Sequence, residues 1–122
     1  PAGGGASALI SAASSKLGSP YVWGAKGPNS FDCSGFVYWC LNQVGVNQSY
    51  LTSSGWRNVG RYTKITNFND IQAGDIVVVR GHVGIAAGGG TVIDASSSNG
   101  RVVHRSLSQW WANNFICAWR IF

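Results

Sequence analysis

The chain has 122 residues, and 45% of them are hydrophobic, which is enough to close the core of one globular domain without a metal or disulfides. Nine Lys and Arg residues against four acidic residues give a formal net charge of +5, which favours an anionic partner. The basic residues are dispersed along the chain, which argues against nucleic acid as that partner and favours an ordinary solvated basic surface. No apolar run approaches the roughly 20 residues of a membrane-spanning helix, so no membrane span is expected.

The first five residues, "PAGGG", are predicted to be a linker remnant, and residues 6–122 are predicted to form a single domain. Three cysteines, Cys33, Cys40 and Cys117, leave at least one thiol unpaired. The chain has no Cys-x-x-Cys motif, and its two histidines lack zinc-ligand spacing. A structural metal site is therefore not expected.

Helices are predicted in the first half of the chain. Apolar residues follow helical spacing over residues 6–17, where Gly18 ends the pattern, and then from Cys33 to Gly45. Cys40 lies on the apolar stripe of the second helix and is expected to point into the core. A short third helix is expected over residues 52–59, capped by the hydroxyl of Thr52 or of its neighbour.

Strands are predicted in the second half. Residues 75–105 are rich in β-branched residues and broken by glycines, which predicts three or four antiparallel strands. Residues 106–115 are expected to form a helical turn, and residues 116–122 a last strand in which Cys117 is buried or half-buried. Helices followed by a meander of strands predict an α+β domain with its helices packed on an antiparallel sheet.

Cys33 is the candidate nucleophile. It stands between Asp32 and a Ser-Gly pair and precedes the apolar stripe by one turn, at the onset of the predicted helix. Unpaired N–H groups and the positive end of the helix dipole stabilise a thiolate at such a place. Packing is the usual role of a cysteine, but these polar and small neighbours favour a reactive thiol.

His82 is the candidate base. Strand alternation puts it on one face with Gly84 and Ala86, and we expect these small residues to let the helix onset approach closely. If residues 88–90 are a hairpin loop, Asp94 lies opposite Gly84, diagonal to His82 and within reach of a hydrogen bond to its ring. His104 lies between arginines with no carboxylate partner that the sequence places, and is expected to be structural.

Four segments in this order resemble the motifs of the NlpC/p60 family of bacterial cell-wall cysteine peptidases, and they span most of the chain from Tyr21 to Ala95. They are "YVWGAKGPNSFDCSGF", "QAGDIVVV", "GHVGIAAGGG" and "VIDAS". The resemblance implies a papain-like α+β fold with Cys33 as nucleophile, His82 as base and Asp94 as the orienting residue. These are the three residues chosen above from position alone.

The resemblance further implies that Tyr21, Asp32 and Ser34 hold substrate. Asp32 could bind a substrate amine, and the Tyr21 phenol could donate to a tetrahedral oxyanion together with the Cys33 amide. The alternatives are that Asp32 only caps the helix and that Tyr21 only packs. Two positions depart from the common family pattern: Ala25 stands where a second glycine is frequent, and Asp94 where histidine is frequent.

By this resemblance the expected activity is a cysteine endopeptidase of peptidoglycan stem peptides that cuts between γ-linked D-glutamate and the following diamino acid, without a cofactor. The alternatives are an N-acetylmuramoyl-L-alanine amidase and a non-catalytic cell-wall binding module of the same fold. The expected partner is bacterial peptidoglycan and the expected state is a monomer. We expect a secreted or wall-associated location, as an excised domain of a longer chain.

Overall fold

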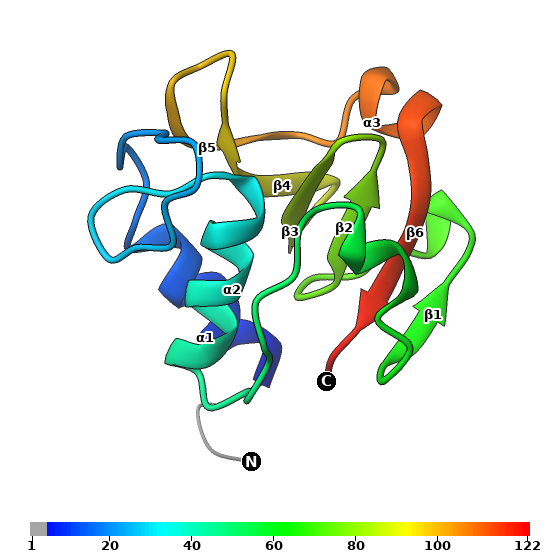
Figure 1. The fold of residues 1–122 in the computed structure, drawn as a ribbon. Helices are drawn as coiled ribbons and strands as arrows, with labels where there is room; N and C mark the ends of the chain where they lie inside the picture. Colours follow the sequence, from blue (N-terminus) through cyan, green and yellow to red (C-terminus); the bar gives the residue numbers. More distant parts are fainter. Residues whose placement is uncertain (1–4) are drawn as a thin grey trace.

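The computed structural model describes residues 5–122 (Figure 1). Residues 1–4, most of the predicted linker, lie outside the described residues, and Gly5 is the first residue of the first helix. The elements in chain order are α1 (Gly5–Ser14), α2 (Cys33–Gln43), the 3-10 helix η2 (Gly55–Asn58), β1 (Thr63–Ile65), the 3-10 helix η3 (Phe68–Asp70), β2 (Ile76–Val79), β3 (His82–Gly88), β4 (Thr91–Ser96), β5 (Arg101–Ser106), α3 (Gln109–Asn114) and β6 (Phe115–Arg120).

The strands form one antiparallel sheet in the order β1-β6-β2-β3-β4-β5. Strands β2 to β5 are a meander, and β6 returns to lie between β1 and β2. Figure 1 shows α1 and α2 side by side against the sheet, with α3 beyond the end where β2 turns into β3. The predicted α+β architecture is confirmed. None of the helices described for residues 5–122 is long and apolar enough to cross a membrane.

The two faces of the sheet have different partners. Val83 and Ile85 of β3 belong to the large core under α1 and α2, together with the buried stripe of α2 that includes Cys40. Ala86 and Val92 belong to a smaller cluster on the other face, which is covered by residues that include Trp111 of α3. The predicted alternation of β3 is therefore correct.

The expected role of the small residues on the His82 face was wrong. Helix α2 packs on the Val83 and Ile85 face, not on Gly84 and Ala86. A Cβ atom at Gly84 would lie 2.9 Å from Cγ2 of Val92, 3.1 Å from Cβ of Asp94 and 3.2 Å from the ring of Trp111. Glycine is favoured at position 84 because these three side chains fill the space that a further side chain would need.

The start of α2 is fixed by Asp32. Its Oδ1 accepts from Gly35 N at 2.6 Å, which is an N-cap interaction, and its Oδ2 accepts from Gly24 N at 2.9 Å. The Asp32 N–H donates to the Ala25 carbonyl at 2.9 Å. The loop before α2 is therefore held against the first turn of the helix, directly at Cys33.

The same loop is also joined to the sheet. Gly18 N donates to Val102 O at 3.0 Å, Val102 N donates to Ser19 O at 2.9 Å, and Tyr21 N donates to Gly100 O at 2.9 Å. Residues 18–21 thus run beside the start of β5 as a short extension of the sheet. Tyr21 is held by backbone bonds rather than by its side chain alone.

Element boundaries differ from the predicted ones where the pattern was short. Helix α1 ends at Ser14, because residues 15–18 form turns rather than a last helical turn. The predicted third helix is the 3-10 turn η2, and Thr52 Oγ1 does accept from Gly55 N at 3.1 Å. The sequence did not predict β1, since three residues at a sheet edge are too few to show alternation.

We expect Gly35→Ala to destabilise the domain by about 2 kcal/mol, because the new Cβ would lie 2.0 Å from the Ala25 carbonyl oxygen and force the loop away from α2. Gly55→Ala is the matched control, since its Cβ would lie 3.4 Å from the side chains of Leu51 and Thr52. Chemical denaturation measures both free energies of unfolding. Equal values for Gly35→Ala and wild type would contradict this close approach.

Candidate active site

Cys33 is the first residue of α2 and is half-buried. Asp32 is the N-cap of α2, so Cys33 lies in the first turn of the helix, beside the backbone N–H groups at the positive end of the helix dipole. The other two cysteines are free and buried in the core, and burial raises the pKa of both the Cys40 and the Cys117 thiol. They therefore remain thiols, whereas Cys33 is half-buried at the onset of α2.

His82 lies between Cys33 and Asp94. The ring Nε2 is 2.7 Å from Asp94 Oδ2, which is the hydrogen bond that the hairpin register predicted. The paired residues Ile85 and Ile93 place Gly84 opposite Asp94. Because Nε2 is engaged by Asp94, Nδ1 is the nitrogen available for the hydrogen bond to Cys33.

The His82 ring is held as an imidazolium. Burial alone lowers the pKa of His82, but the hydrogen bonds to Asp94 and Cys33 and the attraction of their negative charges outweigh burial and raise the pKa to about 9. The proton is therefore bound at neutral pH and is lost only as the pH rises through about 9. A thiolate beside an imidazolium combines a nucleophile with a proton donor.

Arg105, which the sequence analysis did not select, is the second partner of Asp94. Its Nε donates to Oδ1 at 3.0 Å and its Nη2 donates to Oδ2 at 2.6 Å. Asp94 has no exposed surface, whereas a third of the Arg105 side chain is exposed. Arg105 pairs with Val92 across β4 and β5, so it is diagonal to Asp94 on the same face. The register of this hairpin was the signal from which the sequence could have identified Arg105 as a partner of Asp94.

Helix α3 packs against His82 and Arg105, the two side chains that bind Asp94. The buried ring of Trp111 lies 5.4 Å from the His82 ring between centroids, and the Arg105 guanidinium lies 5.5 Å from the Trp111 centroid. Trp111 thus contacts both groups that bind Asp94. The sequence predicted a helical turn here but not its contact with the site.

Tyr21 lies on the Cys33 side of the site. Burial, followed by the negative charges of Cys33 and Asp32, raises the pKa of its phenol. The phenol therefore keeps its proton and can donate a hydrogen bond in the immediate surroundings of the thiol.

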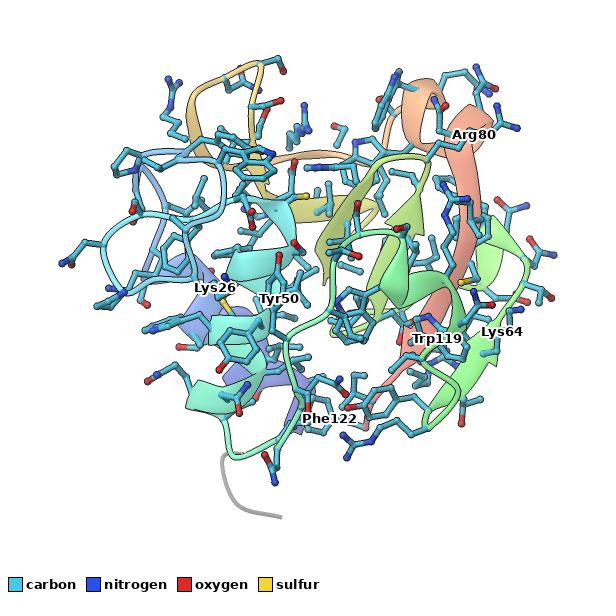
Figure 2. All side chains as sticks on the ribbon, in the orientation of Figure 1. Lys26, Tyr50, Lys64, Arg80, Trp119 and Phe122 are labelled. Atoms are coloured by element: carbon cyan, nitrogen blue, oxygen red, sulfur yellow. The ribbon has the colours of Figure 1, made fainter. Side chains whose placement is uncertain are left out.

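Asp32 and Ser34, the other predicted substrate-binding residues, are engaged with the protein. Both carboxylate oxygens of Asp32 accept backbone N–H groups, as the capping alternative expected. The Ser34 hydroxyl lies 2.9 Å from Tyr50 Oη and 3.4 Å from Asp32 Oδ1. Lys26 lies 4.4 Å from the Tyr50 ring centroid and covers this network from outside (Figure 2).

His104 is placed away from the site. It is exposed on β5, and its Nε2 is 2.8 Å from Thr91 Oγ1. Within residues 5–122 no group of three or more His, Cys, Asp or Glu side chains gathers as metal ligands would. The described site brings together a cysteine, a histidine and a carboxylate, which are the groups that nucleophilic catalysis with proton transfer requires.

The antiparallel sheet with α2 and its N-terminal cysteine packed against it is the papain-like fold of known cell-wall hydrolase domains. The model of the NlpC/P60 family matches residues 18–120. The chain belongs to this family.

Individual relatives agree in sequence and in structure. A probable endopeptidase of Corynebacterium glutamicum is 42% identical over 110 residues, which cover 88% of this chain and 51% of that protein, so the chain spans about half the length of this curated relative. The NlpC/p60 domain of the peptidoglycan hydrolase SagA superposes with a TM-score of 0.77 at 34% identity, covering 93% of this chain and 97% of that domain. The peptidoglycan hydrolase RipB of Mycobacterium tuberculosis gives 0.79 at 28% identity, covering 96% and 64%.

We expect NMR titration of the His82 ring to give a pKa of about 9, above the ordinary 6.5. A His104→Gln background leaves His82 as the single imidazole, because the chain has two histidines. Asp94→Asn and Cys33→Ala should each lower this pKa, since each removes an anion that stabilises the imidazolium while burial of the ring remains. A wild-type pKa at or below 6.5 would contradict the arrangement.

We expect Arg105→Gln to lower the free energy of unfolding by about 2 kcal/mol, because a buried carboxylate loses two charge-assisted hydrogen bonds. Arg101→Gln is the control on the same strand, since within residues 5–122 the exposed Arg101 side chain donates only to the Asn99 carbonyl, at 3.4 Å. Urea denaturation of both variants measures the difference. Equal small effects would show that Arg105 contributes no more than an ordinary surface arginine.

Proposed function

We propose that this domain is a cysteine endopeptidase of bacterial peptidoglycan, with Cys33 as nucleophile, His82 as general acid and base, and Asp94 as the residue that orients His82. Membership of the NlpC/P60 family supports this proposal, as do relatives described as a probable endopeptidase and as peptidoglycan hydrolases. The whole protein that contains the domain is proposed to act at the cell wall, as a secreted or wall-associated chain.

The observation that carries the proposal is the position of His82 between a helix-onset thiol and a buried carboxylate. A core histidine with one structural partner would not also contact a half-exposed cysteine. A nucleophile, a base bonded to it and a third group that holds the base are the parts required for covalent catalysis of acyl transfer.

The reaction proceeds in two steps. The Cys33 thiolate attacks the carbonyl carbon and forms a C–S bond, and His82 gives its proton to the amide nitrogen, so that the C–N bond breaks and the amine leaves. A water molecule then attacks the thioester while neutral His82 takes its proton. The C–S bond breaks, the acid is released, and the thiolate and imidazolium are restored.

The Cys33 side of the site is proposed to hold the acyl half of the substrate. The protonated Tyr21 phenol and the Cys33 backbone N–H are the proposed donors to the tetrahedral oxyanion. Asp32 and Ser34 are proposed to shape this side through the capping network in which they lie. The proposed scissile bond joins γ-linked D-glutamate to the diamino acid.

We expect digestion of a defined disaccharide stem peptide to release a new amine at the diamino acid, identified by mass spectrometry. Cys33→Ala should abolish cleavage and keep the fold. Cys40→Ala should keep cleavage and cost on the order of 1 kcal/mol of stability through a small cavity.

Other outcomes separate the alternatives. A new amine at L-alanine would identify an amidase, and no cleavage by the wild type would leave a binding module. Full activity in Cys33→Ala would refute the proposed nucleophile.

A further inference from the structure

A cavity of about 430 Å³ opens beside His82. Its walls include Arg80 in the turn before β3, Arg105 on β5, Trp110 on α3 and the serines from Ser96 onward that close β4. None of its lining residues belongs to α2 or to the Tyr21 loop. The cavity therefore extends from the histidine side of the site and not from the cysteine side.

The cavity carries positive charge without a matching acid. None of its lining residues is acidic. Arg105 is neutralised by Asp94 through Nε and Nη2, whereas the Arg80 side chain is exposed and has no carboxylate partner among residues 5–122. The Arg80 N–H donates to Asn114 O at 3.0 Å, which fixes the turn next to α3. Figure 2 shows Arg80 at the α3 end of the molecule. Arg80 is thus the uncompensated cation of this cavity.

One of the lining residues is aromatic. Trp110 is half exposed, and its ring centroid lies 6.4 Å from that of His82. An exposed aromatic face next to an arginine and hydroxyl groups suits a short aliphatic chain that ends in an anion.

The reaction decides which half of the substrate meets this cavity. The acyl half becomes bonded to Cys33, while the nitrogen of the leaving half must face His82 to receive its proton. The leaving half therefore extends from His82 into the space next to it, which is the cavity lined by Arg80 and Trp110.

We propose that this cavity is the subsite for the amine-bearing leaving half of the substrate, and that Arg80 binds a carboxylate on that half. This inference rests on the proposed function. An arginine fork pairs with a carboxylate through two parallel hydrogen bonds, which gives both charge and directional selection. The carboxylate can come from the side chain of a dicarboxylic diamino acid or from the free C-terminus of the stem peptide.

Three peptides separate these sources. All three begin with L-Ala-γ-D-Glu. The first ends in meso-diaminopimelate, the second in L-lysine and the third in L-lysine amide, so each step along this series removes one carboxylate. We expect wild-type kcat/KM to fall about tenfold at the step that removes the bound carboxylate. Arg80→Gln should bring that ratio to within about twofold of one.

Lys64→Gln is the matched control, because Lys64 is an exposed cation on β1, at the far edge of the sheet (Figure 2). It should keep the wild-type ratios. A fall at the first step assigns the side-chain carboxylate, and a fall at the second assigns the C-terminal carboxylate. Equal rates on all three peptides in wild type, or an Arg80→Gln variant that keeps the wild-type ratios, would overturn the proposal.

Binding is measured separately from cleavage by calorimetry with Cys33→Ala protein and the same three peptides. If wild type cuts none of them, the proposed function fails. A preference for the peptide with more carboxylates that disappears in Cys33→Ala/Arg80→Gln would still support the anion subsite. The proposal would be overturned if each peptide bound to Cys33→Ala and to Cys33→Ala/Arg80→Gln with equal affinity.

Discussion

The site depends on one buried carboxylate. Asp94 has no exposed surface, and its carboxylate oxygens are held by His82 and Arg105. These partners come from the strands on either side of β4, so the registers of two hairpins decide whether the three groups meet. Gly84 leaves room for Asp94, and the Trp111 ring packs against both partners. A slip of one residue in either hairpin would move a partner to the opposite face of the sheet.

Arg105 also accounts for the departure at position 94. By resemblance, the family often has histidine there, and a neutral ring needs no counter-ion. A buried aspartate does need one, because a carboxylate removed from water without compensation is costly. Arg105 supplies this counter-ion, because its guanidinium donates to both carboxylate oxygens of Asp94. The second departure, Ala25, has a simpler basis. Its neighbour Gly24 has the left-handed backbone, with φ of 81°, and among the described residues only glycines have positive φ. Ala25 is therefore unstrained.

The sequence predicted the contact between His82 and Asp94 because a glycine-rich turn and strict alternation are enough to set the register of one hairpin. It did not predict Arg105, since that required the register of the next hairpin, whose turn at residues 97–100 lacks an equally clear signal. It placed the correct residues on each face of β3 but assigned the wrong face to α2. The small residues Gly84 and Ala86 suggested space for a helix, whereas nothing in the sequence indicated that Trp111 packs on that face. The sequence also failed to predict the packing of Trp111 and the strand β1. Both are determined by tertiary contacts and not by a local sequence pattern.

The backbone bonds that join residues 18–21 to the start of β5 link the two sides of the site mechanically. Tyr21 lies on the thiol side of the site, and the turn after Ser96, which reaches Gly100, borders the space beside the histidine. Since Tyr21 N is bonded to Gly100 O, an outward movement of one wall would pull on the other. This bond ties the loop on the thiol side and the turn on the histidine side to each other, so the positions of the two walls are not independent.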